Sequence, residues 1–168
     1  MKKIVSYMMT GILLLSFLLT GCGSPEPQTG KKMSMYYINT AETKVEVHEQ
    51  YLNTKTLDEQ LDETMRYLST TPEKLEYKAP LDMGFRVLDY EVEDGKLLIN
   101  VDKAYSELSP TTEVLVRAAI VRTLTQLPNV KYVGITVEDS QLYDNAGEMV
   151  GWMNADQFIN NDGNEINT

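Results

Sequence analysis

The chain has 168 residues, a formal net charge of -10 at pH 7, one cysteine and one histidine. This length suits a single ordinary domain. One cysteine forms neither an internal disulfide bond nor a cysteine-based zinc site. The acidic balance argues against a nucleic-acid-binding protein, which needs clustered lysine and arginine. Multi-histidine metal centres are also excluded, and a histidine-dependent catalytic site would have to use His48.

The N-terminal segment has the composition of a secretory signal. Two lysines precede an apolar stretch from Ile4 to Leu19, as in signal peptides. Leu19-Thr20-Gly21-Cys22 then has the leucine, small, small, cysteine order of a bacterial lipobox. We therefore expect residues 1–21 to be a lipoprotein signal peptide that is cleaved between Gly21 and Cys22. The alternative is an uncleaved membrane anchor with an incidental cysteine.

The lipobox gives the single cysteine a role as lipid acceptor. Cys22 is the only cysteine in the chain, and it stands at the one position that a lipobox requires. A diacylglycerol with palmitate-like chains on its thiol satisfies the two-chain requirement for stable anchoring. The mature chain would then sit on the extracytoplasmic face of the cell membrane. Without the two signal lysines it has 13 basic and 25 acidic residues, a charge of -12.

Residues 22–32 are expected to be the acylated N-terminus and a flexible tether. The segment from Gly23 to Gly30 is rich in proline, glycine and polar residues, and it has no apolar periodicity, which is typical of a linker. Lys31 and Lys32 follow it. They either contact anionic lipid headgroups or form an ordinary solvated pair.

Residues 33–140 are expected to form one compact α+β domain. Met33–Asn39 is aromatic and alternating, and Lys44–Glu49 alternates strictly; both patterns predict β-strands. In the second strand the alternation places Val45 and Val47 towards the interior, and Lys44, Glu46 and His48 outward.

The first helix is predicted to begin after Thr56. Thr56 and Glu59 have the spacing of a capping box, in which each side chain satisfies a free backbone N–H at the helix start. Ser69-Thr70-Thr71-Pro72 ends the helix. Its apolar stripe consists of Leu57, Leu61, Met65 and Leu68.

A β-hairpin is predicted around Asp94-Gly95. Both residues tolerate the positive φ that a two-residue type I′ turn needs. Counting outward from the turn pairs Val92 with Leu97, Tyr90 with Ile99, and Leu88 with Val101. This register places apolar residues on one face, while the other carries Asp89, Glu91 and Asn100. A hairpin with one solvated face is therefore expected.

The second helix is predicted to begin at Pro110, with Ser109 as its N-cap, and to end before Pro128. Its main apolar stripe is Val116, Ile120, Leu124 and Leu127. Other apolar residues lie on the opposite side, so the helix has more apolar surface than one core face requires. If the rest of the chain leaves them uncovered, a partner surface is expected at Val114, Leu115, Ala118 and Val121.

A last strand is predicted from Val130 to Val137. The fold is therefore β-(β)-α-β-β-α-β, a sandwich of two helices on a small mixed or antiparallel sheet. Residues 141–168 are expected to be a C-terminal extension that packs on the domain and has a disordered end. The apolar residues for that packing are Val150, Trp152, Met153, Phe158 and Ile159.

No catalytic or metal-binding motif is evident. His48 lacks a nucleophile motif such as Gly-x-Ser-x-Gly and is interpreted as a surface residue. Side-chain oxygens near two turns are possible calcium ligands: Asp139, Asp144, Asn145 and Glu148, and Asn160, Asp162 and Asn164. They lack the spacing of an EF-hand, so solvated turns are the preferred interpretation. No cofactor is expected.

Three segments of the second half resemble the GerMN domain of spore-formation and germination proteins. They are Asn100–Tyr105, Ile120–Val130 and Val133–Val137. The resemblance extends back to Met35 and forward into Gly147–Met153. It implies a compact fold related to the ring-building motifs of secretion and sporulation assemblies, and a non-catalytic scaffold. It implies no catalytic residues. Members are commonly lipoproteins, in agreement with the lipobox.

Together these features predict a lipid-anchored extracytoplasmic protein with one GerMN-like domain. Its membrane contact is the N-terminal lipid, and it would bind a protein partner or a second copy of itself in sporulation, germination or envelope assembly. One alternative is a small solute-binding lipoprotein, which requires a deep apolar pocket with convergent polar groups. The other is a carboxylate-based hydrolase, which requires two close carboxylates in a cleft.

Overall fold

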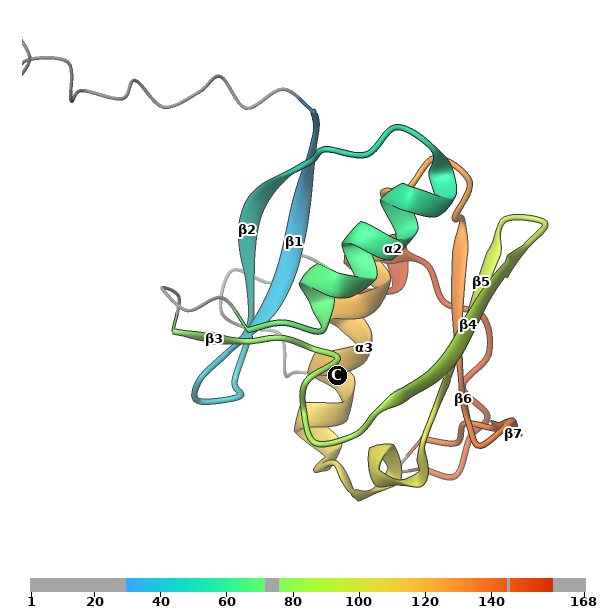
Figure 1. Ribbon diagram of the computed structural model, residues 1–168. Helices are drawn as coiled ribbons and strands as arrows, with labels where there is room; N and C mark the ends of the chain where they lie inside the picture. The colour runs from blue at the N-terminus through green and yellow to red at the C-terminus, as the bar shows by residue number, and fades with distance from the viewer. Residues whose placement is uncertain (1–29, 72–75, 145, 159–168) are drawn as a thin grey trace, which may run out of the picture.

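The computed structural model describes residues 30–71, 76–144 and 146–158, which form two α-helices and two small β-sheets. The helices are α2 (Leu57–Leu68) and α3 (Pro110–Leu124), and they lie between the sheets (Figure 1). The first sheet has the order β2–β1–β3, with β1 (Lys31–Asn39), β2 (Val45–Leu52) and β3 (Tyr77–Lys78). No helix of these residues is both long and apolar enough to cross a membrane.

The second sheet has the order β4–β5–β6–β7. Its strands are β4 (Val87–Glu93), β5 (Lys96–Val101), β6 (Tyr132–Val137) and β7 (Ser140–Gln141). Two short 3-10 segments, η2 (Lys103–Glu107) and η3 (Ala155–Gln157), complete the fold. The predicted α+β class is confirmed, although the strands are divided between two sheets instead of one.

The capping box of α2 is confirmed in both directions. The backbone N–H of Glu59 donates to Thr56 Oγ1 over 3.3 Å, and the backbone N–H of Thr56 donates to Glu59 Oε2 over 3.2 Å. These bonds satisfy two groups that a helix start leaves free. The predicted stripe is buried at Leu61, Met65 and Leu68.

The β4–β5 hairpin has the predicted turn and most of the predicted register. Asp94 and Gly95 have φ values of 49° and 80°, and Val92 pairs with Leu97 and Tyr90 with Ile99. The pairing of Leu88 with Val101 is wrong. The register shifts between Val87 and Asp89, so Val87 pairs with Val101 and Leu88 is 47% exposed. A bulge adds one residue to one strand only, and an alternating pattern does not reveal it.

The prediction that Val47 faces the interior and His48 faces solvent is wrong. Val47 is 54% exposed, whereas His48 lies opposite the buried Met35 and Gln50 opposite the buried Met33. Gln50 Nε2 donates to the hydroxyl of Tyr67 on α2, so this face of β2 points to the helices. Strict alternation gives two faces but does not say which one the helices cover.

Strand β6 runs parallel to β5, so α3 serves as the crossover between them. This pairing aligns Leu97 with Val133 and Ile99 with Ile135, and all four side chains are buried. The following segment packs on the same sheet. The backbones of Val133 and Met153 exchange two hydrogen bonds of 2.8 Å, and Met153 is buried.

Side chains of α3 and of the segment that follows it close one edge of β1. The backbone N–H of Ser34 donates to Gln126 Oε1 over 3.0 Å, and Gln126 Nε2 donates to the Ser34 carbonyl over 2.7 Å. The backbone N–H of Tyr36 donates to Thr123 Oγ1 over 3.1 Å. Farther along the same edge, β3 pairs with Ile38 and Asn39. The edge is therefore satisfied by side chains at one end and by a short strand at the other.

Candidate functional site

The residues that the sequence singled out do not come together. Gly21 and Cys22 lie outside the described residues. The partner surface expected on α3 is wrong at Leu115, Ala118 and Val121, which are 4%, 7% and 0% exposed, while Val114 is 44% exposed. Because α3 packs against β1, β6 and η3, its surplus apolar surface is used within the domain. The apolar residues around α3 therefore indicate a helix that is covered on several sides, not a partner surface.

The acidic turns are organised by their own hydrogen bonds. Asp144 Oδ1 accepts from the backbone N–H of Ala146 and of Glu148, each over 2.9 Å. Asn100 Nδ2 donates to Asp139 Oδ1 over 2.8 Å and to Asp89 Oδ2 over 3.0 Å. The calcium candidates Asn145, Asn160, Asp162 and Asn164 fall outside the described part. Among the residues in view, no group of three or more histidine, cysteine or acidic side chains is placed to hold a metal ion.

Two buried glutamates serve the fold. Glu63 Oε2 accepts from the backbone N–H of Asn53 over 3.0 Å and from Thr54 Oγ1 over 2.7 Å. Glu113 Oε2 accepts from Arg117 Nη2 over 2.9 Å, and Glu113 Oε1 accepts from the Tyr105 hydroxyl over 3.0 Å. Burial raises the pKa of Tyr105 well above its usual value. These contacts satisfy the buried charges, as packed interiors require.

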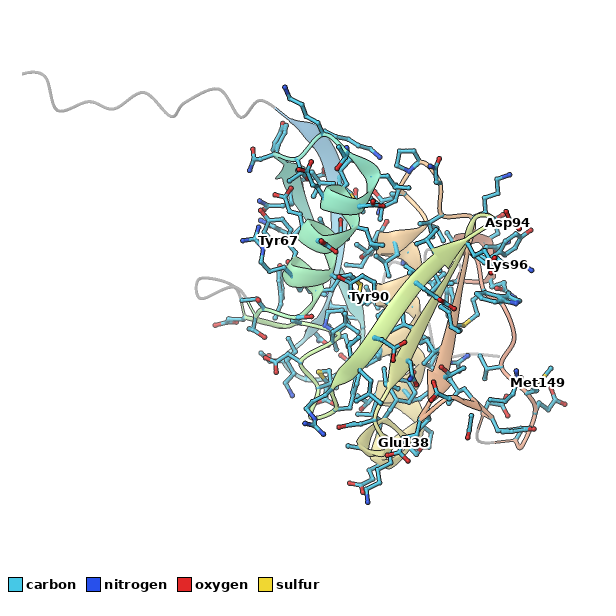
Figure 2. All side chains as sticks on the ribbon, turned by 45° about the vertical axis from the view of Figure 1, so that its right-hand side comes forward. Tyr67, Tyr90, Asp94, Lys96, Glu138 and Met149 are labelled. Atoms are coloured by element: carbon cyan, nitrogen blue, oxygen red, sulfur yellow. The ribbon has the colours of Figure 1, made fainter. Side chains whose placement is uncertain are left out.

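Among the described residues, the strands that stand at an end of a sheet include β2 and β4. β4 stands at the end of its sheet, and within the described residues it pairs only with β5. In a hairpin with a two-residue turn, hydrogen-bonded pairs alternate with pairs whose backbone groups point away. Glu93 and Lys96 flank the turn, so the backbone groups of Tyr90 and Val92 point outward. Figure 2 shows β4 at the front, with Tyr90 beside it.

An open pocket adjoins this edge at the hairpin tip. It has a volume of about 580 Å³. Leu57 comes from the first turn of α2 and Val92 from β4. The other lining residues are Asp94, Gly95, Pro128, Asn129 and Lys131. The pocket is shaped by the loop before β6, since the backbone N–H of Lys131 donates to the Gly95 carbonyl over 2.8 Å.

Helix α2 also borders this pocket, through Leu57. The Tyr90 hydroxyl donates to Asp62 Oδ1 over 2.7 Å, which links β4 to α2 below the pocket. Burial, then the hydrogen bond to Asp62, raises the pKa of Tyr90 to about 12. We call this pocket, together with the adjoining free edge of β4, the β4–α2 groove. Asp58 and Asp62 are exposed on α2, and Glu91 and Glu93 are exposed on the face of β4 that points away from α2.

A protein family described as "Germane: Sporulation and spore germination" matches residues 34–143. The chain belongs to the Germane family. The matched range includes both α2 and β4, so the β4–α2 groove lies inside the Germane domain. No curated protein matches the chain.

Solved structures agree with this assignment at the level of the fold. The chain is similar to the tandem GerMN domains of the sporulation protein GerM from Bacillus subtilis, with 18% identity and a TM-score of 0.53. That match covers 80% of this chain and 49% of the other, so the Germane chain spans about half of the tandem structure. The first GerMN domain of GerM matches with 14% identity and a TM-score of 0.55, over 72% of this chain and 94% of that domain.

The β4–α2 groove could not be predicted from the sequence, for a physical reason. The hairpin and the capped helix were each predictable, and Glu91 was expected on a solvated face. That β4 is an edge strand, and that α2 lies beside it, depends on the order of strands in the sheet. The one available signal was the acidic run Glu91-Val92-Glu93-Asp94, because charged residues are common on edge strands.

Proposed function

We propose that the protein is a lipid-anchored extracytoplasmic lipoprotein whose Germane domain is a non-catalytic protein-binding module in sporulation, germination or envelope assembly. The observation that carries this proposal is the family match over residues 34–143. The similar GerMN domains belong to a sporulation protein, which supports the same setting.

The anchor is argued from the N-terminal sequence. Cys22 is the only cysteine and follows the Leu19-Thr20-Gly21 segment of a lipobox. The adjoining linker of glycine, proline and polar residues leads to β1, which begins at Lys31. A diacylglycerol at Cys22 would hold the domain close to the membrane.

A binding role is favoured over a catalytic one because the acidic side chains named below make structural hydrogen bonds. Glu63 and Glu113 are engaged in buried structural contacts, and Asp139 and Asp144 organise turns. The pocket near the hairpin tip is open and has charged residues in its wall. The outer edge of β4 has no strand partner among the described residues, and an unpaired strand edge is a binding element.

The anchoring experiment uses Cys22→Ala in cells that express the full chain with a C-terminal tag. We expect the wild type in the membrane fraction, labelled by an alkyne palmitate, and the variant unlabelled and released. Ser24→Ala is the matched control and should stay in the membrane. Equal labelling and partitioning of Cys22→Ala and the wild type would disprove the lipid anchor.

The binding role is tested by photo-crosslinking in intact sporulating cells. A photoreactive residue at Val92 should give discrete adducts with one envelope protein, whereas one at Glu148, on the opposite side of the sheet, should not. Loss of the gene should lower the yield of spores or their germination. A deletion strain that sporulates and germinates normally would contradict the proposed setting.

A further inference from the structure

We propose that the β4–α2 groove binds an extended basic segment of a partner protein, which adds as a strand to the free edge of β4. This inference rests on the proposed function as a protein-binding module and names the kind of partner. It is carried by three independent features: unpaired backbone, an adjoining pocket and the charge of the walls.

The first feature is the unpaired backbone of β4. The N–H and C=O groups of Tyr90 and Val92 point away from β5 because Glu93 and Lys96 form the hydrogen-bonded pair next to the turn. An extended peptide beside β4 forms main-chain hydrogen bonds with these groups, and such bonds provide the affinity in other cases of strand addition. The bulge at Leu88 limits regular pairing to the segment after it, from Asp89 to Glu93.

The second feature is the pocket at the hairpin end of this edge. Val92 faces the helices, since it pairs with the buried Leu97. A side chain of an added strand on that face, next to Val92, enters the pocket and meets Leu57 of α2. Pockets for alternate side chains provide specificity in strand addition, because successive side chains point to opposite faces. A medium-sized apolar side chain suits this position.

The third feature is the charge of the walls. Glu91 and Glu93 are exposed on the face of β4 opposite to Val92, where the side chains next to the apolar anchor of an added strand also point. Asp58 and Asp62 are exposed on α2. Lysine or arginine at positions flanking the apolar anchor places opposite charges close together, which favours association and suppresses wrong partners. A second copy of this chain would bring the same acidic edge and a net charge of -10. The favoured occupant is therefore a basic segment of another protein.

The test titrates the full chain, purified in detergent, against a fluorescent peptide of about eight alternating lysine and valine residues, a length typical of short strands. Fluorescence anisotropy should show saturable binding. The same peptide with methylated backbone nitrogens on one edge has the same charge but fewer donors, so its affinity should fall at least about tenfold. Equal affinity for both peptides would overturn strand addition, because charge alone would then explain binding.

Two variants locate the site. Glu91→Lys with Glu93→Lys should weaken binding by at least about tenfold through like-charge repulsion. The matched control is Glu107→Lys with Glu148→Lys, which makes the same charge change at exposed residues outside the groove; it should change affinity less than about threefold. Equal losses in both pairs would overturn the assignment to β4.

Hydrogen exchange identifies the strand directly. The amides of Tyr90 and Val92 should exchange quickly in the free protein and be protected at least about tenfold by the peptide. If these amides are already protected and sedimentation shows a dimer, a second copy occupies the edge and the proposal is wrong. If the peptide binds without protecting these amides, the assignment of the binding site to the β4–α2 groove is wrong. Either failure leaves the lipid anchor and the sporulation setting of the proposed function intact, because the Cys22→Ala and gene-deletion experiments do not depend on the groove.

Discussion

Two strand edges of this domain meet the same physical problem in different ways. Along β1, the groups that β2 does not pair are satisfied by Gln126 and Thr123 of the α3 segment and then by β3. Along β4, the Tyr90 hydroxyl donates a hydrogen bond to Asp62 of α2. The backbone groups that point away from β5 have no strand partner among the described residues. Unpaired edges invite pairing with other chains. The fold closes this edge of β1 and leaves the outer edge of β4 without a strand partner among the described residues.

The largest effect should come from removing the side chain that closes β1. Gln126→Leu leaves the Ser34 N–H and C=O without their partners, and each unsatisfied group costs about 1–3 kcal/mol when shielded from water. Because the region is only partly buried, we expect a loss of about 2–3 kcal/mol in the free energy of unfolding, measured by urea denaturation.

A matched substitution separates the two bonds of that amide. Gln126→Glu keeps an acceptor for the Ser34 N–H but loses the donor to the Ser34 carbonyl, so its stability should lie between those of Gln126→Leu and the wild type. If Gln126→Leu unfolds within about 0.5 kcal/mol of the wild type, the side chain does not close the edge as described.

Thr123→Val should have a smaller effect. Valine fills the same space, so the change removes only the acceptor for the Tyr36 N–H, worth about 1 kcal/mol. Thr125→Val is the control, because the Thr125 hydroxyl donates to the Val121 carbonyl within its own helix segment and does not contact β1. Equal losses in the two variants, again by urea denaturation, would contradict the role of Thr123 at the edge.

At the open edge, Tyr90→Phe should cost less than either change at β1. The substitution removes the bond to Asp62, and the exposed carboxylate then binds water, so we expect about 0.5 kcal/mol. Thermal and urea unfolding should rank this variant above Thr123→Val in stability. A loss equal to that of Gln126→Leu would mean that the crossing between β4 and α2 supports the fold as strongly as the closed edge does.

The smallest effect is a dependence on pH at the end of β1 that β3 closes. Hydrogen bonds from Lys78 and then Thr112 lower the pKa of Glu42. A carboxyl group with a lowered pKa in the folded state adds stability above the ordinary glutamate pKa and loses it as the pH falls through the lowered value. The free energy of unfolding should therefore decline in acid.

Glu42→Gln should remove this part of the acid dependence, because glutamine does not titrate. Urea unfolding of both proteins between about pH 6 and about pH 3 measures the difference in slope. Identical slopes would show that Glu42 does not link acid to the stability of the β3 closure.

The local features could be predicted from the sequence because short-range chemistry sets them. The capping box at Thr56 and Glu59, the N-cap Ser109 with Pro110, and the positive φ of Asp94-Gly95 depend on residues within a few positions of one another. The register of Val92 and Tyr90 follows from that turn. The lipobox at Cys22 is also a local pattern, although its chemistry is a prediction still to be tested.

Long-range packing decides features of the fold that the amino-acid composition leaves undetermined. The acidic balance argues against a nucleic-acid partner, but only the strand order places Glu91 and Glu93 beside a free strand edge. The apolar excess of α3 indicated burial on several sides, and the contacts with β1 and β6 show what covers it. Local chemistry fixes where an element begins and turns. Which edge stays open depends on contacts between residues far apart in the chain, and periodicity does not contain them.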